Sequence, residues 1–294
     1  METLIQYQEL MRTILENGKD KTDRTGVGTK SIFGAQMRFD LSEGFPAVTT
    51  KKLFWKGFVA ELLWMIEGSA DERRLCEIMH GTRDDSKTTF WTANANAPYW
   101  INNAKFKGDL GKVYGYQWRH WESDKVRWVS SNESEPVVID QLAELIDGIK
   151  NNPSSRRHIM SAWNVAQLDD MALPPCHVLS QFDVTDGKLS CQLYQRSADF
   201  FLGVPANILS YSLLTCLIAQ VCDLEVGEFI WTGGDVHIYN DHIEQAKEQL
   251  SRYPYQLPKL WLNPDIKIID DFTMDDIKIL DYQYHPAIKA DMAV

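Results

Sequence analysis

The most reactive side chain in the sequence is the thiol of Cys176, which follows Pro174 and Pro175 in the run MALPPCHVLSQF (171–182). Proline fixes φ at about −65° and favours extended geometry in the residue before it, so a stiff arm should lead to the sulfur atom. A thiolate held in one place can act as a nucleophile. The alternative is that Cys176 is a small buried apolar residue, as many free cysteines are.

A carboxylate stands where proton transfer is possible. Glu61 lies inside 55–66, a stretch with apolar residues at almost every helical position. A helix that is apolar on all sides is usually buried, and burial disfavours the charged form of a carboxylate. Carboxylates whose pKa is raised in this way exchange protons near neutral pH. A structural salt bridge is the alternative role for Glu61.

Arginines on loops indicate an anionic ligand. The four concerned are Arg24, Arg156, Arg157 and Arg196. Each guanidinium can donate two parallel hydrogen bonds to a phosphate or carboxylate. The adjacent pair at 156–157 stands on a short loop between a predicted helix at 137–149 and a predicted strand at 158–165. Solvated arginines without a ligand are the alternative.

Composition limits the class of protein. The net charge of −11 over 294 residues argues against a nucleic-acid surface, which needs a basic face. The five cysteines are odd in number and form no CxxC pair, which indicates neither a zinc site nor a disulfide framework and favours the reducing cytoplasm. The longest apolar run, near 208–222, is too short to span a bilayer. We find no linker or repeat, so we expect one domain over 1–294.

The elements that must position these side chains form an α+β pattern. Periodicity predicts helices at 4–15, 55–66, 137–149, 208–222 and 241–252, and strands at 31–41, 158–165, 178–184, 189–195 and 228–239. Asp186-Gly187 is a strong hairpin signal, and the helix at 208–222 should be central and buried. The segment 84–103 is typical of a surface, and 108–121 of a loop wall against which a flat ring can lie.

Polar residues at the ends of these elements could recognise a base and a sugar. Asn207 stands at the entrance of the apolar helix, where it could be an N-cap or an amide that donates to and accepts from a base edge. Both roles can hold at once. His237 and Tyr239 are two apart on a predicted strand, so they point to the same face and could reach one ligand together.

Eight motifs in order resemble thymidylate synthases. They are DRTGVGT, ELLW, GDLGKVYGYQWR, SSRRHIMSAWN, MALPPCH, YQRSADFFLGVPANI, WTGGDVHIYNDH and the ending HPAIKADMAV. The resemblance implies a homodimeric α+β protein, with a large mixed β-sheet packed against a central buried helix and dimerising through the sheet. It also implies reductive methylation of deoxyuridine monophosphate (dUMP) by 5,10-methylenetetrahydrofolate, giving dTMP and dihydrofolate, with no metal.

The resemblance implies a covalent mechanism. Cys176 would attack C6 of uracil and so turn C5 into a nucleophile for the one-carbon unit. Glu61 would run a proton network at O4 of the base. The further residues with implied catalytic or supporting roles are Tyr114, His177, Gln195, Asp199 and Asn207.

The resemblance also implies two sets of binding residues. The dUMP phosphate would be held by Arg24, Arg196 and Ser197, with Arg156 and Arg157 supplied by the second subunit. Asn207 would match N3 and O4 of uracil, and His237 and Tyr239 would take the sugar hydroxyl. Asp199 would serve both ligands. The folate would contact Trp91 and Asp199, and the carboxy-terminal Val294 would close the lid over the site.

Three departures from the family pattern keep a second reaction open. Thr-Ala-Asn follows Trp91, Ala198 stands where Cys is common, and Ala206 where Phe is common. A wetter wall could let water replace hydride, giving a dUMP hydroxymethylase. A Cys-His peptidase is disfavoured, because adjacent residues such as Cys176 and His177 point to opposite faces of a strand. A silent binding module would not need a nucleophile, an acid and an arginine clamp together.

Overall fold

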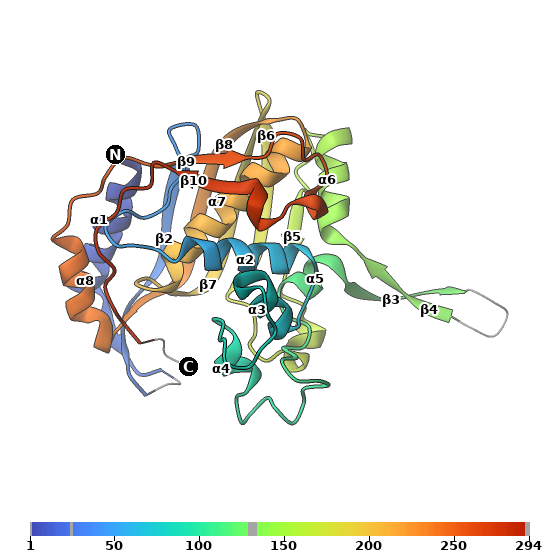
Figure 1. The fold of residues 1–294 in the computed structure, drawn as a ribbon, viewed down its shortest axis with the longest axis horizontal. Coiled ribbons are helices and arrows are strands. Elements are labelled where there is room, and N and C mark those ends of the chain that lie inside the picture. Colours follow the sequence, from blue (N-terminus) through green and yellow to red (C-terminus); the bar gives the residue numbers. More distant parts are fainter. Residues whose placement is uncertain (1, 24–25, 129–133, 292–294) are drawn as a thin grey trace.

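A computed structural model describes residues 2–23, 26–128 and 134–291. Its main feature is a six-stranded sheet with the order β1-β2-β8-β7-β6-β5 (Figure 1). The strands are β1 (Lys19–Lys21), β2 (Thr29–Asp40), β5 (Ile159–Ser161), β6 (His177–Thr185), β7 (Lys188–Asp199) and β8 (Glu225–Tyr239). The β7–β8 pair is parallel and the other pairs are antiparallel, so the sheet is mixed.

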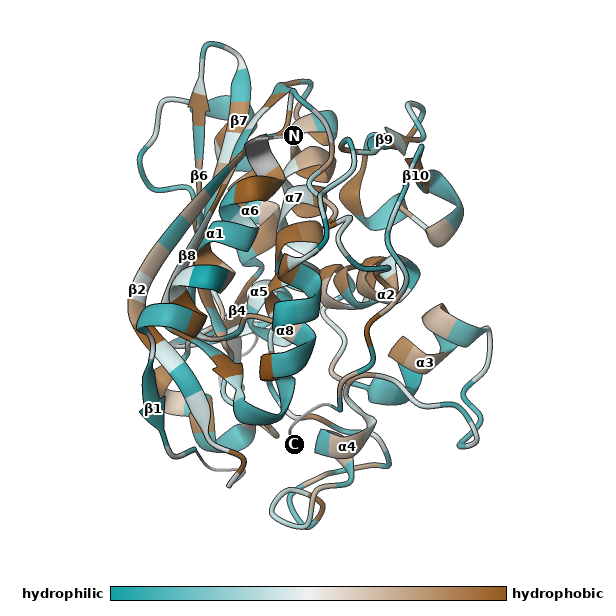
Figure 2. Ribbon diagram, turned by 90° about the vertical axis from the view of Figure 1, so that its left-hand side faces the viewer, coloured by the Kyte–Doolittle hydropathy of each residue, from teal (hydrophilic) through white to brown (hydrophobic). Residues whose placement is uncertain are grey.

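Most of the helices lie on one face of this sheet. The helices are α1 (Glu2–Asn17), α2 (Trp55–Ile66), α3 (Glu72–His80), α4 (Thr92–Ala95), α5 (Gly115–Arg119), α6 (Gln141–Asn151), α7 (Gly203–Val221) and α8 (Ile243–Leu250). In Figure 2 the long strands lie to the left and most helices lie to their right. The predicted α+β fold with a large mixed sheet and a central helix is therefore confirmed.

The central helix is α7, which packs against β7, β8 and α2. Its apolar residues point in all directions because protein surrounds it, and most of its side chains are buried. Within the described part of the chain, α7 is the one helix long and apolar enough to cross a membrane, but most of it is buried inside the protein.

Smaller elements surround this core. Two short hairpins pair β3 (Trp121–Trp128) with β4 (Ser134–Ile139), and β9 (Lys259–Leu262) with β10 (Ile277–Leu280). Short 3₁₀ turns occupy η1 (Val165–Asp170), η2 (Asn240–His242), η3 (Ile269–Asp271) and η4 (Met274–Asp276). The β3–β4 hairpin projects from the body (Figure 1).

The hairpin turn between β6 and β7 is where the sequence placed it. Asp186 and Gly187 have φ values of 51° and 74°. Positive φ at both central residues is the geometry of a type I′ turn, which matches the twist of the paired strands.

The helix predicted at 137–149 was wrong at its start. Residues 137–139 belong to β4, and α6 begins at Gln141. Val137, Val138 and Ile139 are β-branched and favour a strand, and the Asp140 side chain then caps the helix by accepting from the N–H of Ala143 (2.9 Å).

The strand predicted at 158–165 was too long, because β5 ends at Ser161. The side chain of Gln141 accepts from the Ser161 N–H (2.9 Å) and donates to the Ser161 carbonyl (2.8 Å). An amide side chain thus pairs with the backbone there, and the chain continues into η1.

Three further expectations need correction. Asn207 is not an N-cap, because α7 begins at Gly203 and Asn207 lies within the helix. The segment 84–103 is not simply surface: it contains α4, and Trp91 and Trp100 are buried. The loop wall expected at 108–121 contains the short helix α5.

Candidate active site

The sheet register brings residues far apart in sequence to one end of the sheet. Cys176 immediately precedes β6, where His177 pairs with Gln195 of the antiparallel β7. Asp199, at the end of β7, pairs with His237 of the parallel β8. The start of β6 and the ends of β7 and β8 therefore lie together at one end of the sheet.

The arm that carries Cys176 is held from two sides. The Cys176 N–H donates to the Tyr114 hydroxyl, and the Arg196 N–H donates to the Cys176 carbonyl (both 2.9 Å). The Arg196 guanidinium donates to the carbonyls of Pro175 (2.9 Å) and Pro174 (2.7 Å). The two prolines and these bonds together fix the position of the thiol.

The environment of the thiol contains opposing influences. Burial raises the pKa of Cys176, while the positive charge of Arg196 and a hydrogen bond with Tyr114 lower it, and burial dominates. The guanidinium of Arg196 also lies 5.3 Å from the ring centre of Trp163. Cys176 is therefore a thiol at neutral pH in the ligand-free protein, with a cation beside it that favours the thiolate.

Tyr114 has a strained backbone. Its φ is 31°, a value that residues other than glycine rarely adopt. The next residue, Gly115, lies so close to α2 that an added Cβ would be 2.3 Å from the Met65 carbonyl oxygen. The close approach of α5 to α2 thus places the Tyr114 hydroxyl under Cys176.

His177 and Asn207 form a hydrogen-bonded pair next to the thiol. The Asn207 Nδ2 lies 2.7 Å from Nε2 of His177. Burial lowers the pKa of His177 to about 4, so the imidazole is neutral at pH 7. Its Nδ1 is buried and has no hydrogen-bond partner among the described residues. An unpaired buried polar atom beside a nucleophile is expected where a ligand or water binds.

Glu61 lies on α2 and is bonded to Trp91. The indole Nε1 of Trp91 donates to Oε1 of Glu61 at 2.7 Å. Burial raises the pKa of Glu61 to about 7, while this bond lowers it. No ion pair to Glu61 is present in the described ranges, so the salt-bridge alternative has no support. The Tyr114 ring lies 5.6 Å from that of Trp91 and 5.1 Å from that of His177, so it connects Glu61 to the Cys176 end of the site.

His237 and Tyr239 lie together on β8, with ring centres 5.2 Å apart. Nδ1 of His237 lies 2.9 Å from Oδ1 of Asp235, and Asp235 also accepts from Lys21 (2.8 Å) and Ser31 (2.9 Å). Asp235 therefore orients the imidazole. Sequence reasoning missed Asp235, although the alternation Asp235-x-His237-x-Tyr239 places it on the same face.

The side chains at the end of β7 have internal partners. Buried Gln195 accepts from the Trp231 indole (2.9 Å) and donates to the Ser197 carbonyl (3.0 Å), so it supports Ser197. Asp199 Oδ1 accepts from the N–H groups of Phe201 (3.0 Å) and Leu202 (3.1 Å), just before α7. Both side chains are thus fixed before any ligand binds.

Lys51 is a buried residue that sequence reasoning missed. Its Nζ lies 3.5 Å from the ring centre of Phe201. Burial lowers the pKa of Lys51 to about 7, and the charge of Asp199 opposes the shift. The available signal was the polar run 49–52 immediately before an apolar helix.

A comparison with protein families identifies the family to which this fold belongs. The model of a family described as thymidylate synthase matches residues 5–294. The chain belongs to the thymidylate synthase family. Membership implies a methyltransferase of dTMP biosynthesis, and the family uses dUMP and methylenetetrahydrofolate.

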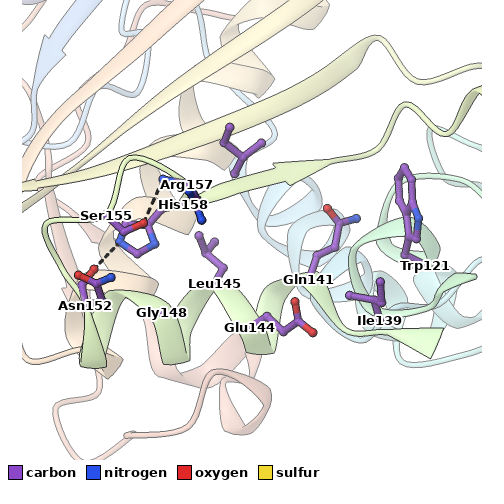
Figure 3. Close-up of a pocket in the computed structure, with 11 residues that line it drawn as sticks. Trp121, Ile139, Gln141, Glu144, Leu145, Gly148, Asn152, Ser155, Arg157 and His158 are labelled. Atoms are coloured by element: carbon purple, nitrogen blue, oxygen red, sulfur yellow. Dashed lines mark hydrogen bonds between the residues drawn. The ribbon is translucent and has the colours of Figure 1, made fainter. Parts of the chain in front are cut away.

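In this thymidylate synthase family member, Arg156 and Arg157 are not near Cys176 of the same chain. Both are exposed, and the adjoining His158 carbonyl accepts from the N–H of Phe182. Phe182 lies six positions after Cys176, which corresponds to a distance of about 20 Å in an extended strand. Figure 3 shows Arg157 and His158 at a separate pocket, between α6 and the base of the β3–β4 hairpin. The cavity volume is about 430 Å³.

Two expected site residues, Arg24 and Val294, lie outside the described residues. Among the residues that are described, no group of three or more His, Cys, Asp or Glu side chains is placed to hold a metal ion.

Proposed function

We propose that the protein is a thymidylate synthase that converts dUMP and 5,10-methylenetetrahydrofolate to dTMP and dihydrofolate. The observation that carries this proposal is the neutral His177–Asn207 pair beside the Cys176 arm. This pair lies at the end of the sheet that also holds Arg196 and His237. A nucleophile, a base-reading amide, a cation and a sugar-binding pair are the groups that a nucleotide substrate of this reaction needs.

Asn207 reads the uracil edge in this proposal. With its proton on Nδ1, the neutral imidazole accepts one hydrogen of the Asn207 amide at Nε2, so the amide nitrogen is the donor in this pair. The second amide hydrogen then faces O4 of uracil, and the amide oxygen accepts from N3–H. A cytosine ring presents the opposite pattern at both positions and is rejected.

Cys176 forms the covalent bond. The thiol proton passes to water, the sulfur attacks C6 of uracil, and the electron pair of the C5–C6 double bond moves towards O4. The positive charge of Arg196 lowers the pKa of the Cys176 thiol and so favours the thiolate. Glu61, with a pKa of about 7, can both give and take a proton at the O4 side.

The folate position is proposed beside Trp91 and Asp199. Trp91 would pack beside the pterin, and the fixed Asp199 carboxylate offers an acceptor. Methylenetetrahydrofolate, when bound, supplies the one-carbon unit and the hydride. The roles of Arg24 in phosphate binding and of Val294 in closing the site are proposed on the family resemblance.

We further propose a cytoplasmic homodimer formed through the open face of the sheet. The strand register places Arg38, Ile230, Gln192, Gln181 and Ile159 in one row across that face. Ile159 is 46% exposed and Tyr194 in the next row is 37% exposed. Pairing through this face would also explain how Arg156 and Arg157, remote from their own Cys176, serve the phosphate of the partner's site. The five free cysteines fit a reducing compartment.

Incubating the protein with dUMP and methylenetetrahydrofolate tests the reaction. Thymidylate synthesis oxidises the folate, so absorbance from dihydrofolate should rise in step with dTMP. The alternative, a dUMP hydroxymethylase, is favoured by the small side chains of Ala198, which is fully buried, and Ala206. That reaction would give 5-hydroxymethyl-dUMP and tetrahydrofolate without the absorbance change.

A further inference from the structure

A buried ion pair lies beneath the segment that carries Trp91. Glu72 and Arg73 begin α3 and are 1% and 8% exposed. Nε of Arg73 donates to Oε2 of Glu72 (2.6 Å), and Nη2 donates to Oε1 (2.5 Å). The proposed reaction assigns no role to this pair.

Two threonine hydroxyls converge on the same carboxylate. Oγ1 of Thr89 and Oγ1 of Thr92 donate to Oε1 of Glu72, at 2.7 and 2.6 Å. Burial opposes the ionisation of Glu72, but the hydrogen bonds from Arg73, Thr92 and Thr89 outweigh it and hold its pKa below the usual value. Glu72 is therefore a carboxylate at neutral pH, and both hydroxyl protons point at it.

These hydroxyls in turn hold the backbone around Trp91. Because their protons point at Glu72, their oxygen atoms are left as acceptors. Oγ1 of Thr92 accepts from the N–H of Thr89 (2.8 Å), and Oγ1 of Thr89 accepts from the N–H of Trp91 (3.1 Å). We call Glu72, Arg73, Thr89 and Thr92 the Trp91 clamp.

Arg73 fixes the other end of the same segment. Its Nη1 donates to the carbonyls of Asp84 and Lys87, both at 3.1 Å. The segment from Asp84 to Trp91 contains no described helix or strand, so these bonds replace the regular pairing that would otherwise fix its path. The clamp thus holds the segment before and after the exposed residues 85–88.

We propose that the Trp91 clamp is a positioning device, which holds the Trp91 indole so that its N–H meets the carboxylate of Glu61. The path is continuous: the clamp bonds the Trp91 backbone, and the Trp91 side chain bonds Oε1 of Glu61 at 2.7 Å. The inference rests on the proposed function only for the consequence that turnover depends on Glu61.

A structural role alone would stabilise the segment without changing Glu61. A positioning role changes how Glu61 binds its proton, because the Trp91 hydrogen bond favours the carboxylate. The other titratable groups that interact with Glu61 are the phenols of Tyr114 and Tyr211. Both have raised pKa values, so they stay neutral while Glu61 titrates.

The test is a carboxyl titration of the ligand-free protein by carbon NMR with labelled glutamate, in which the Glu61 signal is identified by its loss in Glu61→Gln. The test variant, Thr89→Val/Thr92→Val, removes both hydroxyls with little change of shape. Thr88→Val, at an exposed position of the same segment, is the matched control. We expect the double variant to titrate about one pH unit higher than wild type, and Thr88→Val to titrate like wild type.

An unchanged titration in the folded double variant would overturn the positioning role. Should the double variant not fold, Thr92→Val decides in its place, with Thr92→Ser, which keeps the hydroxyl, as its control. A Glu61 titration that moves to higher pH in Thr92→Val but not in Thr92→Ser supports the clamp. Equal Glu61 titration in these two variants overturns it. The readout needs no substrate, so a clamp effect in a protein that makes no dTMP would leave the inference standing and reject the proposed function.

Discussion

The Asn207 amide nitrogen and the His177 Nε2 atom lie 2.7 Å apart in an environment that keeps the imidazole neutral. A neutral ring can accept the amide hydrogen, whereas a protonated ring could not. When the neutral ring carries its proton on Nδ1, it accepts one amide hydrogen and leaves the other amide hydrogen and the amide oxygen of Asn207 to face a base.

Asn207→Asp should weaken the preference for uracil. A protonated carboxyl can donate to N3 of cytosine and accept from its amino group, which is the reverse of the pattern that uracil needs. We expect the ratio of dUMP to dCMP affinity to fall by at least about tenfold. Titration calorimetry with both nucleotides measures this ratio, and an unchanged ratio would remove Asn207 from base recognition.

Cys176→Ser should abolish turnover while leaving dUMP binding nearly intact. A hydroxyl at neutral pH is a far poorer nucleophile than a thiolate, so we expect a loss of at least about a thousandfold in kcat. Cys222→Ser, at a half-buried thiol just after α7, is the control and should retain activity. Near-normal turnover in Cys176→Ser would exclude the covalent mechanism.

Glu61 and His177 should change stability with pH in opposite directions. The native pKa of Glu61 is raised from 4.5 to about 7, so its contribution is full at low pH and is lost as pH rises through this range. The native pKa of His177 is lowered from 6.5 to about 4, so its contribution is full above 6.5 and is lost as pH falls. Between about pH 5 and 6.5 the two effects oppose each other.

Single substitutions should reveal each effect. In Glu61→Gln the free energy of unfolding should rise more steeply with pH than in wild type across that window, and in His177→Gln it should rise less or fall. Urea unfolding at several pH values gives the slopes. Parallel slopes in wild type and Glu61→Gln would show that Glu61 has an ordinary pKa.

The proposed dimer predicts complementation between two inactive proteins. Cys176→Ala lacks the nucleophile, and Arg156→Glu/Arg157→Glu lacks the arginines proposed to serve the partner. In a mixed dimer one site receives both defects and the other receives none. Random pairing makes about half of the dimers mixed, so about a quarter of wild-type activity should return.

Subunit exchange followed by the dihydrofolate assay measures this recovery. Each parent protein, exchanged with itself, is the control. Verified mixed dimers with no activity above the two parents would show that the arginines do not act across the interface.

Local sequence preferences explain the parts of the fold that were predicted well. The turn at Asp186-Gly187 follows from residues that favour positive φ. The buried helices follow from the segments 55–66 and 208–222, which are apolar on all sides. The start of the helix at 137–149 was misplaced because Val137 to Ile139 fit both an apolar helical stripe and a strand. Pairing with β3 decided between the two.

The residue types of the candidate site were visible in the sequence, but their partners were not. Glu61 was expected to be buried, yet its bond to Trp91 joins residues 30 positions apart. Asp235, Lys51 and Glu72 were missed, because a charged residue gives no sign in the sequence of the side chain it will meet.

The sequence by itself determined the stiff arm before Cys176, the apolar helices and the order of family motifs, because these depend on backbone preference and on burial pattern. Only the tertiary structure decided that His177 is neutral, that Trp91 is held over Glu61, and that Arg157 lies far from Cys176. The hydration of a side chain and its distance from other side chains depend on how strands pair and how layers pack. Residues adjacent in sequence do not specify this pairing and packing.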